Sequence, residues 1–84
     1  MVKTTQATIK NLERDRARLV KTIAGRERAL ADLEQKLKGS LLPAQRADFE
    51  RRRAEVALWL PVHQARLTAL DQTLAALQSE VDHA

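Results

Sequence analysis

Residues 54–70 read AEVALWLPVHQARLTAL, a run of good helix formers with a proline in its middle. Leu60 and Val62 flank this Pro61, and neither neighbour is one of the Gly, Asn, Asp or Ser residues that turns use. We therefore expect Pro61 to lie within one long helix and to kink it. The alternative is a break at Pro61, which would give a three-helix bundle.

The spacing of apolar residues around this stretch favours the continuous helix. A seam with alternating steps of three and four residues runs from residue 46 to residue 81 without a change of phase at Pro61. Its members are Arg46, Phe49, Arg53, Val56, Leu60, His63, Leu67, Leu70, Leu74, Leu77 and Val81. If the chain turned at Pro61, the apolar spacing before the turn would not need to stay in phase with the spacing after it. The seam thus predicts a helix over about residues 44–82, with Pro61 on its outer side.

The first half of the chain carries a matching seam. Its members are Val2, Thr5, Ile9, Leu12, Arg16, Leu19, Ile23, Arg26, Leu30, Leu33 and Leu37. It predicts a helix over about residues 4–38, which Gly39 would end through a left-handed cap. Pro43 suits the first turn of the next helix, where its missing N–H group costs nothing. Two long helices joined by about residues 39–43 must fold back on each other.

The predicted fold is therefore all-α, an antiparallel two-helix coiled-coil hairpin that forms a single domain over residues 1–84. If Leu37 faces Arg46, then Leu19 faces His63, and no layer of the paired seams holds two charged residues. The three seam arginines are expected to bend towards acidic residues at the edge of the seam, and Asp15 is expected to pair with Arg66. These arginines are Arg16, Arg26 and Arg53, and the edge acids are Glu13, Glu34, Glu50 and Asp71.

Size and composition indicate that the hairpin has a partner. An 84-residue chain buries only about 60 to 65% of its extended surface on folding, and without cysteine it has no disulfide to stabilise it. The longest apolar run is far shorter than a membrane span, and the N-terminus has no signal-peptide pattern. We expect a cytoplasmic protein with no integral membrane association. The abundance of Ala, Arg and Leu is typical of a bacterial or phage source.

The outward positions of the second helix are unusually apolar. The predicted interface, here called the apolar patch, consists of Ala54, Leu58, Trp59, Val62, Ala65, Ala69 and Ala76. Small residues allow close approach of another helix, and a helix that is apolar on every side is normally buried. We expect a homodimer in which the two second helices pack together into a four-helix bundle. The alternatives are a different partner protein, or alanines that serve only helix propensity.

The outward positions of the first helix are basic instead. Residues 1–40 carry ten Lys or Arg and five acids, whereas residues 41–84 carry five and six. The basic stripe consists of Lys3, Lys10, Arg14, Arg18, Lys21, Arg28 and Lys38, and extends along most of the first helix. It predicts contact with an acidic protein surface. The alternative is nucleic-acid binding through phosphates, which the nearby acids and the absence of stacking aromatics disfavour.

No residue pattern indicates catalysis. His63 has no Cys or second His at ligand spacing, so it is expected to be a packed seam histidine, and no serine has a base within reach. We therefore predict no catalytic, cofactor-binding or metal-binding residues. The predicted function is that of a non-enzymatic protein-protein interaction module. Such a module could serve as an adaptor, a cochaperone, an inhibitor or an assembly subunit.

Overall fold

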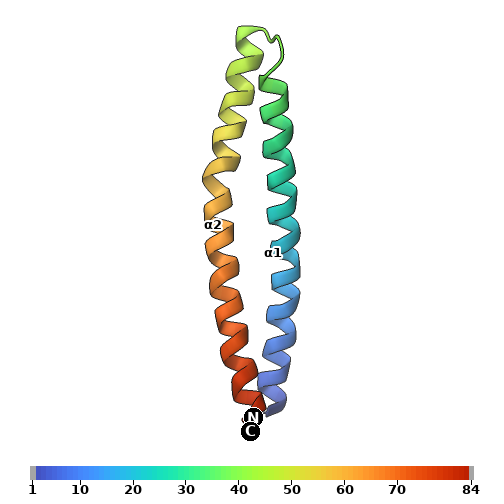
Figure 1. Cartoon of the computed structure of the whole chain (residues 1–84). Helices are drawn as coiled ribbons and strands as arrows, with labels where there is room; N and C mark the ends of the chain where they lie inside the picture. Colours follow the sequence, from blue (N-terminus) through green and yellow to red (C-terminus); the bar gives the residue numbers. More distant parts are fainter. Residues whose placement is uncertain (1, 84) are drawn as a thin grey trace.

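A computed structural model describes residues 2–83 of the chain, and the side chains of residues 3–83. It contains two helices, α1 (Val2–Leu37) and α2 (Pro43–Asp82). They run antiparallel side by side, and the start of α1 and the end of α2 lie together at the end of the rod opposite the turn (Figure 1). The rod measures 62 × 15 × 14 Å. The predicted all-α hairpin is confirmed.

The helix α2 continues through Pro61, so the three-helix alternative is wrong. The proline side chain is exposed, on the outer side of α2. A proline has no N–H group for the carbonyl four residues earlier, which here belongs to Ala57. Figure 1 shows α2 bowed, with its convex side away from α1 in the yellow-to-orange middle of the helix. The lost hydrogen bond therefore lies on the convex side of α2. Long helices normally curve with their convex side towards solvent, so the proline follows the usual curvature.

The turn closes without the left-handed residue that we expected at Gly39. No described residue has a positive φ angle. Instead the N–H groups of Lys38 and Gly39 donate to the carbonyls three residues earlier, on Gln35 and Lys36, each at 3.2 Å. Such short-range bonds tighten a last helical turn and satisfy its carbonyls, so a left-handed cap is not needed.

Arg46 ties the turn to the start of α2. Its guanidinium donates to the carbonyl of Leu37 at 3.1 Å and to that of Gly39 at 3.2 Å. These are carbonyls at the end of α1, which a helix leaves without partners. Nearby, the N–H of Leu42 donates to Oε1 of Gln45 at 3.2 Å, and Pro43 occupies the first helical position. A charged seam residue thus serves as the C-terminal cap of the other helix.

The core is a single line of seam residues between the helices. The buried side chains are Ile9, Leu19, Ile23, Leu33, Val56 and Leu60. Leu30, Phe49 and Leu67 pack against the larger part of this cluster. None of the described side chains falls below 2% exposure. The seam predicted from spacing is the core, but this core is only one layer thick.

Gly25 offers a direct test of helix propensity in α1. Apart from its chain neighbours and the backbone of its own helix, a Cβ atom at this position would have no atom within 4 Å, so alanine fits without strain. Alanine is favoured over glycine within a helix by about 1 kcal/mol. We expect Gly25→Ala to raise the free energy of unfolding by about that amount in urea titrations followed by circular dichroism. An unchanged or lower stability would contradict the helical interior assigned to Gly25.

Candidate interaction surfaces

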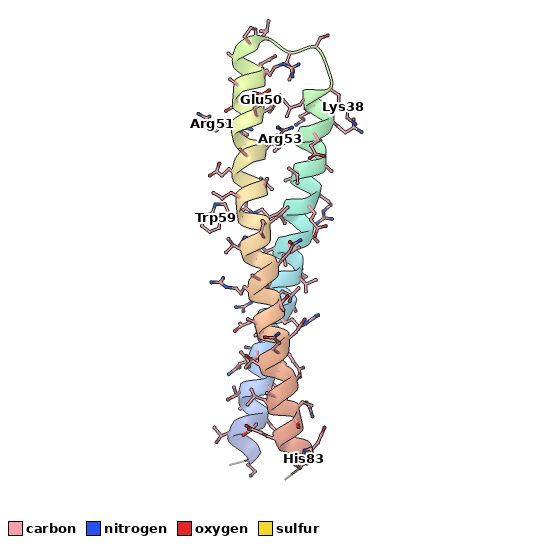
Figure 2. The ribbon with its side chains drawn as sticks, turned by 60° about the vertical axis from the view of Figure 1, so that its left-hand side comes forward. Lys38, Glu50, Arg51, Arg53, Trp59 and His83 are labelled. Carbon is pink, nitrogen blue, oxygen red and sulfur yellow. The ribbon has the colours of Figure 1, made fainter. Side chains whose placement is uncertain are left out.

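The apolar patch is open to solvent in the hairpin. Leu58 is 68% exposed, Val62 49% and Trp59 46%, although each is a large apolar residue. The four alanines of the patch are exposed as well. Figure 2 shows Trp59 projecting from α2 on the side away from α1. The patch is therefore a feature of the outer surface of α2, separate from the core seam.

Trp59 and His63 are stacked along α2. Their ring centroids are 6.3 Å apart, with 28° between the ring planes. His63 is half-buried in the seam, and its Nδ1 has no hydrogen-bond partner among residues 2–83. The imidazole therefore packs as a flat ring between the core and the indole, and Trp59 is held at one margin of the patch.

The basic stripe consists of exposed cations without internal partners. All seven members are exposed, and none has a carboxylate within 4 Å in the part of the chain that the structure describes. The cations that do form ion pairs lie elsewhere: Lys36 with Asp32, and both Arg51 and Arg52 with Asp48. The stripe cations thus form no ion pair of their own among residues 2–83.

One seam arginine reaches the acidic edge as predicted. Nε of Arg16 donates to Oδ1 of Asp71, and Nη2 donates to Oδ2 at 3.4 Å. This hydrogen bond and the attraction between the charges raise the pKa of Arg16 above its ordinary value. The pair ties α1 to α2 near the middle of the hairpin. Its exposure to water keeps its contribution to stability small.

The other predicted edge pairs do not form. Arg26 and Arg53 are exposed, and within residues 2–83 neither has an ion pair with Glu34 or Glu50. A long arginine stem can lie over the seam while its head stays in water, so an ion pair is not needed to tolerate it there. The pair expected between Asp15 and Arg66 is likewise absent, although both residues line the same groove.

That groove, here called the central groove, was not predicted from the sequence. It is an open depression of about 540 Å³ between the helices. It is lined by Asp15, Arg18, Leu19 and Thr22 of α1 and by His63, Arg66, Ala69, Leu70 and Thr73 of α2. The small residues Thr22, Ala69 and Thr73 at its rim are the sequence signal that could have revealed it. Ala69 belongs to both the groove and the apolar patch, so the two features adjoin.

No protein-family model, no curated protein and no solved structure matches this chain. Neither α1 nor α2, as described, contains an apolar stretch long enough to span a membrane. Within residues 2–83, no three His, Cys, Asp or Glu side chains lie close enough together to hold a metal ion. The candidate surfaces are therefore defined by their positions in the hairpin alone. The apolar patch lies on α2, and the basic stripe lies on α1 with Lys38 one residue beyond its end.

Proposed function

We propose that the protein is a non-enzymatic helical interaction module that self-associates through the apolar patch of α2. The observation that carries the proposal is the joint exposure of Leu58, Trp59 and Val62 on one side of a helix whose other side packs against α1. Contiguous exposed apolar residues of this size are typical of protein-protein interfaces. A second copy supplies a surface of the same kind, as a two-fold symmetric interface requires.

The thin core supports the same proposal. A single seam with no fully buried side chain gives an isolated hairpin little apolar burial to offset the entropy of ordering two long helices. Packing α2 against α2 of a second copy would add a second buried layer. The resulting four-helix bundle would hold the two α1 helices, with their basic stripes, on its outer sides.

A double substitution in the patch tests the proposal. We expect the natural protein to have twice its 9.5 kDa chain mass in light scattering, and Leu58→Glu with Val62→Glu to have the mass of one chain. The reason is that four carboxylates in an apolar interface would lose their hydration and repel one another. Both positions are exposed in the hairpin, so the helical circular dichroism signal should persist.

A matched control adds the same charge outside the patch. Gln35 and Gln64 are exposed, and their side chains are on neither surface. Gln35→Glu with Gln64→Glu should keep the dimer mass. A natural protein with the mass of a single chain, or a patch variant that stays dimeric, would contradict the proposal.

We further propose that the basic stripe binds an acidic surface of a partner protein. The support is the set of exposed, unpaired cations along one side of α1. Self-association through α2 leaves this side free apart from Arg18, which also lines the central groove, so one dimer would present two stripes. The protein would then act as an adaptor or assembly subunit that brings two acidic partners together.

A second candidate function is nucleic-acid binding through phosphates, and the same unpaired stripe supports it. If phosphates are the target, the logarithm of the affinity for duplex DNA or RNA falls linearly with the logarithm of salt concentration. Replacing Arg14, Arg18 and Lys21 by Glu should then abolish tight binding and reduce that slope by roughly 0.7–0.9 for each lost contact. An affinity and salt slope that do not change in this variant would exclude the nucleic-acid candidate.

A further inference from the structure

Resting on the proposed self-association, we infer that two copies pack antiparallel through α2, with Trp59 of each copy in the central groove of the other. The starting point is a second seam on α2, distinct from the core seam. Its members are Arg51, Glu55, Leu58, Val62, Ala65, Ala69, Gln72 and Ala76, and all are exposed. Their steps alternate between four and three residues, which is the spacing of a coiled-coil interface.

The charges of this outer seam select the antiparallel orientation. In a parallel pair each residue meets its own copy, so Arg51 would face Arg51 and Glu55 would face Glu55. In an antiparallel pair with Glu55 opposite Gln72 of the second copy, Arg51 lies opposite Ala76, and no layer joins like charges. Like-charge contacts are unfavourable across helical interfaces, so the antiparallel pairing is preferred.

The sizes of the central residues fit the same register. With Glu55 opposite Gln72, Leu58 lies opposite Ala69 and Val62 lies opposite Ala65 of the second copy. By symmetry these two pairings give four consecutive apolar layers, each with one large and one small side chain. A parallel pair would instead place Ala65 and Ala69 each against its own copy, which leaves two adjacent layers without a large side chain.

The register also brings Trp59 to the central groove. Trp59, Arg66 and Thr73 lie seven residues apart on the same flank of α2, and the latter two line the groove. In an antiparallel pair, equivalent flanks meet, so Trp59 of one copy lies level with residue 68 of the other, between Arg66 and Ala69 of the groove. Trp59 does not line the groove of its own chain. Its outward position in Figure 2 leaves the indole free to cover another copy.

The groove has the chemistry to receive an indole. On its α2 side, Ala69 provides a small apolar contact. Arg66 provides a cation that has no ion pair within residues 2–83. A guanidinium over an indole ring is a favourable cation–π arrangement. The stack with His63 fixes Trp59 before it binds, which lowers the entropy cost of burying it. Each dimer makes this contact twice.

Disulfide trapping tests the register, because the chain contains no cysteine. We expect a mixture of Glu55→Cys and Gln72→Cys copies to form a covalent dimer on mild oxidation, and each variant alone to remain uncrosslinked. In the proposed register, like cysteines would lie about 25 Å apart along the helix axis. A disulfide requires Cα atoms within roughly 7 Å. Both residues are polar and exposed, so neither change removes an apolar contact.

The outcomes separate the register from the self-association itself. Crosslinking of each variant with itself, in a sample with dimer mass, would overturn the antiparallel register and leave the proposed function intact. A dimer without any crosslink would do the same. A single-chain mass for the natural protein would overturn both.

The fluorescence of Trp59, the one tryptophan of the chain, tests whether the indole enters the central groove of the other copy. We expect its emission to move to shorter wavelength as the protein concentration rises through dimerisation, because the indole leaves water. Arg66→Gln should weaken dimerisation about five- to thirtyfold, from two cation–π contacts. Arg28→Gln, on α1, is the control and should leave the dimer affinity unchanged. Emission that does not shift in the dimer would overturn the placement of Trp59.

Discussion

Replacing Leu60 by alanine is expected to lower the free energy of unfolding by about 2–4 kcal/mol. Leu60 is 8% exposed and belongs to the buried cluster between α1 and α2. The change removes apolar contacts and leaves a cavity that two rigid helices cannot fill. For a chain of this size, the loss corresponds to a decrease of roughly 10–25 °C in melting temperature. Thermal unfolding at a fixed protein concentration measures it.

Leu42→Ala is the matched control for this substitution. Leu42 is 67% exposed in the turn and packs into no core. Leucine and alanine are equally poor N-cap residues, so the stability should change by less than about 0.5 kcal/mol. Equal losses for Leu60 and Leu42 would contradict the hairpin core.

Replacing Pro61 by alanine is expected to have the opposite effect and to raise the free energy of unfolding by about 1–3 kcal/mol. The new N–H group can donate to the carbonyl of Ala57, and the ring no longer crowds that carbonyl. Because Pro61 is exposed, no buried contact of the hairpin is lost. Urea titration at fixed protein concentration measures the gain, and circular dichroism should show that the helix content does not fall.

Pro43→Ala provides the control for the backbone effect. Pro43 is the first residue of α2, where an N–H group would have no intrahelical acceptor. Its replacement should change stability far less than that of Pro61. If both substitutions gave the same result, or if Pro61→Ala destabilised the protein, the continuous α2 would be contradicted.

The hairpin could be predicted from the sequence because its core depends on one periodic pattern. Each buried residue, from Ile9 to Leu60, is a seam position, and the unchanged phase at Pro61 correctly indicated a continuous helix. The exposure of the apolar patch followed from the same period, since its residues lie outside the seam, with Trp59 at the margin. Periodicity is reliable here because two long helices joined by a short turn have few ways to pack.

Local details did not follow from this pattern. The turn at Gly39 uses short-range backbone hydrogen bonds together with the guanidinium of Arg46, and period alone does not indicate either. Of the three seam arginines, only Arg16 gained an ion pair across the helices, because the outcome depends on the reach of each long side chain. The central groove arises from small residues on two different helices, so it requires their relative placement.

The start of α1 and the end of α2 lie at the same tip of the rod, and this determines how the protein would respond to force (Figure 1). Pulling on residues 2 and 83 would load the contacts between α1 and α2 one at a time, starting at the open tip. The pairs of facing residues would separate one after another at low force. In a coiled coil that is pulled from opposite ends, all pairs carry the load at once. An optical-tweezers experiment on these two ends would therefore record gradual opening that stops at the turn held by Arg46.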